Sequence, residues 1–338
     1  FLMNKGLIIL LLSISMLLLA VLDIFSGSVS IPFNEFKLWI KGSETSDVFN
    51  FIVVQSRIPK ALTAILCGAA LSLAGLLMQT LFRNPLAGPY LLGISSGAGL
   101  GVAVLIMSAG FIGIGIATGS VITFAAIAGA LFMMLVLLAV SFKIKDVMTL
   151  LIFGVMMGSI ATAIIGLIQF FTSDFQLKSF IIWTLGSLSA VSYAELLVLF
   201  VSLVLSAACA LYNYKGLNAV LISEDFAKML GIKVLHVRLS VVLITGLLAG
   251  LTTAFCGPIG FVGIIIPHLS RLLLKSNDHL VLIPICLLLG ANILLLSDII
   301  SHLPTNGTSL PINSITSIIG IPIILWILFG NKNISQSF

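Results

Sequence analysis

The sequence has very little charge. Only 8% of its 338 residues are Asp, Glu, Lys or Arg, whereas 60% are hydrophobic. A soluble domain is about a quarter charged and just under half apolar. The mean hydropathy of +1.28 therefore argues against a soluble enzyme, a disordered chain and, despite the basic pI of 9.1, a nucleic-acid-binding protein. Because one membrane-spanning helix needs about 20 apolar residues, we expect a polytopic membrane protein.

The motifs of common catalytic and metal sites are also missing. There is no Gly-Lys dipeptide, and hence no phosphate-binding loop, and neither HExxH nor Gly-x-Ser-x-Gly occurs. The four histidines are scattered. The four cysteines lie in apolar runs without a CxxC spacing, which indicates buried thiols. They are Cys67, Cys209, Cys256 and Cys286. We expect no enzymatic activity, no cofactor and no metal site.

Ten apolar runs predict an all-α chain with ten membrane-spanning helices in a single domain, 1–338. The run at 260–274 is short and contains Pro267. Ten spans place both termini on the same side of the membrane. We place the spans near 7–25, 61–82, 90–109, 114–141, 148–171, 192–212, 238–256, 260–274, 280–301 and 312–330.

The distribution of positive charge predicts the orientation. With the N-terminus in the cytoplasm, eleven of the 16 Lys and Arg residues fall on the cytoplasmic side, and the remaining ones fall in 26–60 and at Lys178. Positive residues are enriched in cytoplasmic loops. We therefore expect both termini, loop 143–147 and segment 213–237 in the cytoplasm.

Within that segment, 216–236 has the features of a short surface helix. Ser223 can cap it, Glu224 and Asp225 suit its first turn, Lys228 follows Glu224 at i+4, and Gly231 can end it. Such a helix could contact a partner or be a connector on the membrane surface. The residues concerned are Ser223, Glu224, Asp225, Phe226, Ala227, Lys228, Met229, Leu230 and Gly231.

Interrupted helices point to a transport pathway. Two Leu-Ala-Gly-Leu segments, 73–76 and 248–251, are each followed by Gly-Pro and another apolar run, in spans that run in opposite directions. This pattern is typical of an inverted repeat. Glycine pairs four apart, such as Gly97 and Gly101, suit close helix packing. The candidate pathway or hinge residues are Gln79, Asn84, Pro85, Gly88, Pro89, Gly257, Pro258 and Pro267.

Few ionisable residues lie within the spans. Asp23, Glu195 and Asp298 fall near predicted ends. An ion-coupled carrier usually has an acidic group deep in its bundle. This pattern argues against a secondary transporter, and indicates that energy enters from outside the chain, with 223–231 as the point of entry.

Five blocks resemble a known family. They are RIPKALTAILCGAALSLAGLLMQTLFRNPLAGPYLLGISSGAGLG from Arg57, SEDFAKMLGI from Ser223, GPIGFVGIIIPHLSR from Gly257, GANILLLSDIISH from Gly290 and LPINSITSIIGIP from Leu310. In order and over most of the chain, they resemble permease subunits of type II ABC importers for iron–siderophore complexes, haem and vitamin B12 (FecCD-type).

The resemblance implies an assembly in the bacterial cytoplasmic membrane. It would contain a homodimer with a central pathway, two cytoplasmic ATPase subunits that bind ATP and Mg²⁺, and an external substrate-binding protein. It also implies that Arg57, Lys60 and His302 form a cationic rim that docks the binding protein. The chain departs from the family pattern at Ser223, which replaces Gly, at His302, which replaces Arg, and at Ser309, Asn313 and Ile324.

Other readings remain open at this point. A stand-alone secondary transporter and a non-transporting membrane scaffold are the alternatives to an ABC permease. For the cargo, an iron chelate (siderophore or haem) is favoured because such family members are numerous; cobalamin or an oxyanion such as molybdate is the alternative. Fold alone does not choose the ligand.

Overall fold

The computed structural model describes residues 5–27, 46–112, 119–144, 146–303 and 309–330. Within these ranges the chain is helical and has no strand. Seven helices are long and apolar enough to span a membrane, and three shorter apolar helices, Ile94–Met107, Val262–Leu274 and Ile312–Trp326, bring the set to ten. The predicted all-α fold is confirmed, and each helix of this set coincides with one predicted span.

The elements follow one another along the chain with short connections. They are α1 (Lys5–Phe25), α3 (Asp47–Asn50), a π-helix (Phe51–Arg57), α4 (Ile58–Phe82), a 3-10 helix (Pro89–Leu92), α5 (Ile94–Ile112), α6 (Gly119–Ser141), α7 (Val147–Phe170), α8 (Asp174–Thr184), α9 (Tyr193–Tyr212), α10 (Tyr214–Ile222), α11 (Glu224–Met229), α12 (Val234–Cys256), α13 (Val262–Leu274), α14 (His279–Ser301) and α15 (Ile312–Gly330).

Two predicted boundaries were wrong. The second span was expected at 61–82, but α3, the π-helix and α4 form one continuous apolar helix, Asp47–Phe82. The outer segment 172–190 contains a helix, α8, that the sequence pattern did not predict. In both places the helix extends past charged residues that were taken as span ends.

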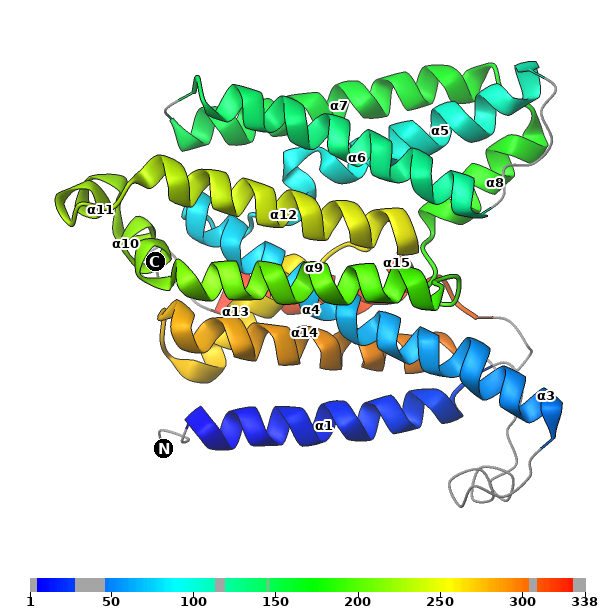
Figure 1. Cartoon of the computed structure of the whole chain (residues 1–338), viewed down its shortest axis with the longest axis horizontal. Helices are drawn as coiled ribbons and strands as arrows, with labels where there is room; N and C mark the ends of the chain where they lie inside the picture. Colours follow the sequence, from blue (N-terminus) through cyan, green and yellow to red (C-terminus); the bar gives the residue numbers. More distant parts are fainter. Residues whose placement is uncertain (1–4, 28–45, 113–118, 145, 304–308, 331–338) are drawn as a thin grey trace.

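The long helices lie side by side around α4 (Figure 1). Helices α9, α12, α13 and α14 all contact α4, while α1 packs on α14, and α5, α6 and α7 form a group beyond α12. Most of α4 is buried, and its small residues such as Ala64, Ala70 and Ala74 leave little side chain between it and its neighbours. The core of the molecule is therefore built on α4.

Glycines allow α4 to approach its neighbours at backbone distance. A Cβ at Gly68 would lie 2.2 Å from the carbonyl oxygen of Gly290 in α14, and one at Gly75 would lie 1.7 Å from that of Gly263 in α13. In a membrane, such contacts replace the hydrophobic driving force between helices.

The two Leu-Ala-Gly-Leu segments make reciprocal contacts. Gly75 of the first faces the start of α13, the helix after the second Gly-Pro break. Gly250 of the second faces Ile94, the first residue of α5, after the first break, with 3.7 Å between a Cβ at 250 and Ile94 Cγ2. This exchange is the relation that an inverted repeat predicts.

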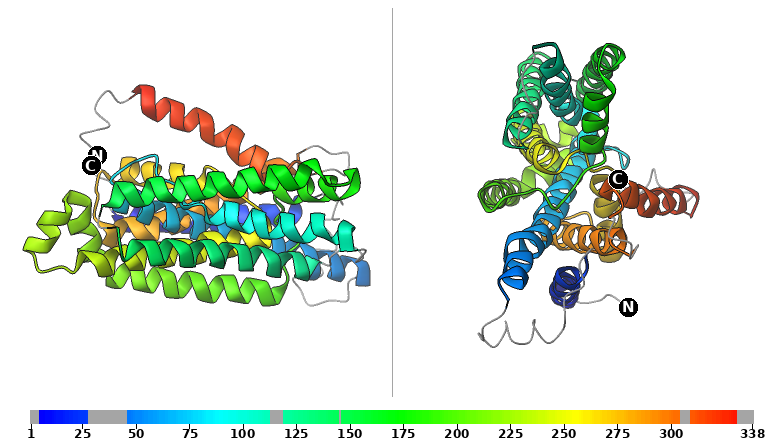
Figure 2. Two further views of the ribbon diagram at one scale, coloured as in Figure 1. Left: turned by 90° about the horizontal axis from the view of Figure 1, so that it is seen from above. Right: turned by 90° about the vertical axis from the view of Figure 1, so that its right-hand side faces the viewer.

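The connections lie at two opposite ends of the bundle. Helices α10 and α11 project from one end, whereas α3 and α8 lie at the other (Figure 1). Helix α1 begins and α15 finishes toward the α11 end (Figure 2). The termini and segment 213–237 thus lie on one side, as predicted; which side is cytoplasmic is taken up below.

Candidate functional site

Helix α11 forms where the sequence predicts it. The Ser223 hydroxyl accepts a hydrogen bond from the Phe226 amide at 2.9 Å, which caps the N-terminus. Gly231 follows the helix with φ +76°, a left-handed conformation that a side chain would strain. The cap and the glycine fix a helix of only six residues, Glu224–Met229.

One face of this helix presents apolar side chains at the end of the bundle. Met229, Leu230 and Phe226 are 86%, 59% and 39% exposed, whereas Ala227 is fully buried against the protein. Three exposed apolar side chains beside a buried alanine indicate a contact surface, because their burial against a partner would remove apolar area from water.

The charges of α11 pair differently from the prediction. Lys228 was expected to pair with Glu224, but its Nζ lies 2.9 Å from Asp225 Oδ1. Their hydrogen bond lowers the pKa of Asp225 and raises that of Lys228. Both side chains are exposed, so the pair adds little stability.

Glu224 instead attaches α11 to the membrane domain. Its Oε1 accepts from Arg238 Nη2 of α12 at 2.8 Å, and Arg238 Nη1 donates to the Ile144 carbonyl, also at 2.8 Å, in the α6–α7 connection. Arg238 is only 4% exposed. One buried guanidinium therefore joins α11, α12 and the α6–α7 connection.

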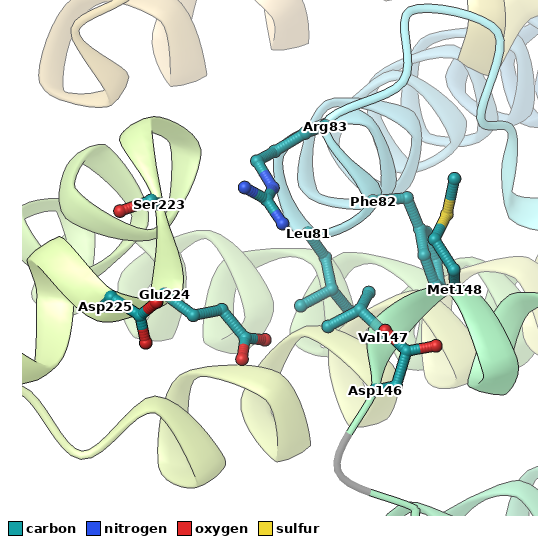
Figure 3. Close-up of a pocket in the computed structure, with 9 residues that line it drawn as sticks. All are labelled: Leu81, Phe82, Arg83, Asp146, Val147, Met148, Ser223, Glu224 and Asp225. Carbon is teal, nitrogen blue, oxygen red and sulfur yellow. The ribbon is translucent and has the colours of Figure 1, made fainter.

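A cavity of about 440 Å³ lies between α11 and the ends of α4 and α7 (Figure 3). Arg83 points from the end of α4 toward α11, and Glu224 and Asp146 reach in from the other walls. Asp146 caps α7 by accepting from the Thr149 amide and hydroxyl at 2.7 and 2.6 Å, which lowers its pKa. The sequence analysis missed Arg83 and Asp146; an Asp immediately before an apolar run was the signal for the cap.

The predicted pathway residue Gln79 is packed inside the bundle. Its Nε2 donates to the Ile264 carbonyl at 2.9 Å, and its Oε1 accepts from Arg271 Nη1 at 2.5 Å. All these groups lie between α4 and α13. Gln79 thus connects two helices of this chain.

The other candidate pathway residues fall into three groups. Asn84, Pro85, Gly88 and Pro89 form the turn after α4, where Asn84 Oδ1 accepts from the Leu86 amide. Pro267 is buried inside α13. Gly257, with φ +75° before Pro258, ends α12. Gly257 also lines an outer cavity of about 500 Å³.

That cavity is bordered by α6, α8, α9 and the end of α12, and its lining includes Cys256. The prediction of buried thiols is confirmed for Cys67, Cys256 and Cys286, and wrong for Cys209, which is exposed on α9. Cys67 and Cys256 lie with their sulfurs 3.3 Å apart as free thiols between α4 and α12.

The three proposed docking residues meet at the outer end, but they point inward. Lys60 Nζ lies 2.8 Å from Asp298 Oδ2 and 3.4 Å from Asp23 Oδ1. Arg57 Nη1 donates to the Ile24 carbonyl at 3.1 Å. His302 Nδ1 contacts the Asp298 carbonyl at 2.9 Å.

The expected open cationic rim is therefore not the arrangement found. Arg57 and Lys60 are only 4% and 3% exposed, because Asp23 and Asp298 neutralise them beneath the end of α1. The sequence pattern could not show this, since Asp23 and Asp298 are distant in the chain from Lys60. Any role in docking stays a prediction.

Comparison with known proteins places this architecture. The model of the FecCD transport family matches residues 14–330. The chain is 36% identical to the vitamin B12 import system permease protein BtuC of Citrobacter koseri, over 95% of this chain and 93% of the relative. The same-named protein of Klebsiella pneumoniae is 36% identical over 87% of each chain.

A solved structure has the same fold over almost the whole length. It is described as a metal-chelate type ABC transporter in an inward-facing conformation, and it matches with a TM-score of 0.81 and 28% identity over 97% of this chain and 100% of the other. The chain is a multi-pass membrane protein that belongs to the FecCD transport family of ABC importer permeases.

Proposed function

We propose that the chain is the permease subunit through which a bulky metal chelate enters the cytoplasm, with vitamin B12 as the favoured cargo. The observation that carries the transport role is the exposed apolar face of α11, held to the membrane helices by Glu224 and Arg238. A permease without nucleotide-binding motifs needs such a surface to receive work from an ATPase.

The α11 end is the cytoplasmic end in this proposal. It carries Lys215, Lys228 and Lys233 on segment 213–237, and the positive-inside rule favours the cytoplasm for that side. Met229, Leu230 and Phe226 are the anchors that enter a groove of the ATPase subunit, in the helix-in-groove mode. The ATPase subunit binds ATP and Mg²⁺; this chain supplies the docking helix.

The choice of cargo differs from the expectation drawn from the sequence. An iron chelate was favoured, but the relatives named above import vitamin B12, which favours the alternative. Cobalamin is itself a metal chelate, in keeping with the metal-chelate type of the matching structure. Iron–siderophore complexes and haem become the second choice.

A homodimer with an external binding protein completes the proposed assembly. Two copies would enclose a pathway between them, and the binding protein would supply affinity and selectivity at the α3 and α8 end. Support for this part comes from the family membership.

The alternative of a secondary transporter has one structural argument, the buried carboxylates of Asp23 and Asp298. An acidic pair in a transporter is a candidate ion site. Here Lys60 lies within ion-pair distance of both, so the pair is matched by a fixed cation and does not need a transported one.

The decisive experiment is uptake by the reconstituted complex. The permease, its ATPase and its binding protein are placed in proteoliposomes and supplied with radiolabelled vitamin B12, haem or a ferric siderophore. ATP-dependent uptake of vitamin B12 supports the proposal. Uptake of another chelate alone changes the cargo, and uptake driven by an ion gradient without ATPase refutes the ABC mechanism.

A further inference from the structure

Four polar side chains form a continuous hydrogen-bonded network where α10 meets α4 and α14. Asn218 belongs to α10, Thr80 lies in the last turn of α4, and Asp278 and His279 start α14. Thr80 and His279 are fully buried. Asn218 Nδ2 lies 2.8 Å from Asp278 Oδ1, Asn218 Oδ1 lies 2.6 Å from His279 Nδ1, and His279 Nε2 lies 2.6 Å from Thr80 Oγ1.

The direction of each hydrogen bond follows from the chemistry of the groups. An ionised carboxylate only accepts, so Asn218 must present its NH₂ to Asp278. This bond lowers the pKa of Asp278, which precedes α14, and keeps the group ionised. The carbonyl of Asn218 then faces His279 and accepts both its backbone N–H, at 3.0 Å, and its ring Nδ1–H.

The same logic sets the far end of the network. His279 is the first residue of α14, where the helix dipole disfavours an imidazolium, so the ring is neutral. With the proton on Nδ1, Nε2 is an acceptor, and the Thr80 hydroxyl donates to it. Each link has one donor and one acceptor. A buried network with all members satisfied holds its helices in a single arrangement.

This network joins the docking helix to the core of the bundle. Ser223 both ends α10 and caps α11, so the two short helices share a residue and move together. Asn218 attaches α10 to α4 and α14, while Glu224 attaches α11 to α12 through Arg238. The segment is therefore held at two points, one on each side of its shared residue.

We propose that Thr80, His279, Asn218 and Asp278 form a positioning unit that transmits movement of α11 to α4 and α14. The inference rests on the proposed ATPase-coupled function. Buried apolar residues of α10, such as Leu217 and Val220, also hold the helix. Apolar packing tolerates sliding, whereas hydrogen bonds weaken steeply when distance and angle change, so the polar links carry the movement.

The test is the number of substrate molecules moved per ATP hydrolysed. The complex with ATPase and binding protein is reconstituted with vitamin B12 as the probe, and the stimulation of ATPase activity by the binding protein is measured beside uptake. Thr80→Val removes the hydroxyl at nearly constant volume. We expect uptake per ATP to fall about fivefold or more, in the range of typical coupling between sites. Asn218→Leu should act in the same direction.

Two variants serve as controls. Thr80→Ser keeps the hydroxyl and should restore the ratio. Thr63→Val removes a hydroxyl that is equally buried in α4 but bonds only the Pro59 carbonyl of its own helix, at 2.7 Å, and it should leave the ratio unchanged. Basal ATPase activity should persist in each.

The outcomes separate the inference from the proposed function. If Thr80→Val lowers thermal stability and both rates in proportion, with an unchanged ratio, the network is only structural and the inference is wrong. If wild-type complex takes up no vitamin B12 but its ATPase still responds to the binding protein, only the cargo proposal fails, and the response of each variant still decides the inference. A wild-type ATPase without any response overturns the proposed function itself.

Discussion

Arg238 and Glu224 form a buried ion pair, 2.8 Å from Nη2 to Oε1, between a membrane-spanning helix and the short helix at the end of the bundle. The guanidinium is 5% exposed and the carboxylate 22%. A pair at this position fixes where α11 lies relative to α12, and the function proposed for α11 depends on that fixed position.

The first prediction concerns this pair. Arg238→Met should lower the free energy of unfolding by about 1.5–3 kcal/mol, because Glu224 and the Ile144 carbonyl lose a charged donor. Denaturant titration in detergent measures it. If the ion pair is responsible, Arg238→Met should cost less in a Glu224→Gln background. Equal costs in both backgrounds would assign the effect to lost packing.

The second prediction concerns the docking face. Leu230→Asp should abolish ATP-driven uptake while the permease still folds, because Leu230 is 59% exposed and its truncation or charging at an interface costs about 1–4 kcal/mol of binding. Co-purification of the ATPase subunit measures binding. Tyr212→Asp, 88% exposed at the end of α9, is the control and should retain the ATPase. Normal uptake by Leu230→Asp would move the coupling role elsewhere.

The third prediction concerns the outer charge cluster. Lys60→Met should destabilise the permease by about 3–5 kcal/mol, because Asp23 and Asp298 would share a buried site without their cation. Thermal unfolding in detergent measures it. Lys178→Met changes an exposed lysine of α8 and should have no effect.

The same variants decide the role in docking. Binding-protein affinity for proteoliposomes is measured across a salt series with Arg57→Glu and Lys60→Glu. Loss of affinity without loss of stability would support docking. Loss of stability alone would limit these residues to the fold.

The fourth prediction concerns topology. In a Cys209→Ser background, an impermeant maleimide should label Ser189→Cys in intact cells and Lys215→Cys only after permeabilisation, because the two exposed positions lie at opposite ends of the bundle. Labelling of both in intact cells contradicts the ten-span arrangement.

Local patterns predicted much of this structure. Apolar runs gave the ten spans, and Ser223 and Gly231 gave the limits of α11, because capping and span length depend on neighbouring residues. Partners distant in the chain were beyond local patterns: Lys60 with Asp298, Arg238 with Glu224, and Asn218 with His279. The chain fold brings these together, and a single sequence does not contain their pairing.

The last prediction concerns the contact of α4 with α13. Gly75→Ala should lower the yield of folded permease sharply, because its Cβ would overlap the Gly263 carbonyl oxygen at 1.7 Å, a backbone atom that cannot rotate away. The helices would have to separate, which removes close packing along α4. Gly166→Ala is the matched control: this glycine also lies within a membrane helix, α7, but has nothing within 4 Å of a Cβ, so the change should be neutral or slightly stabilising. Size-exclusion profiles and thermal unfolding of both variants measure the difference. Equal stability of the two would show that α4 and α13 do not pack at backbone distance, and would remove one half of the reciprocal contact that supports the inverted repeat.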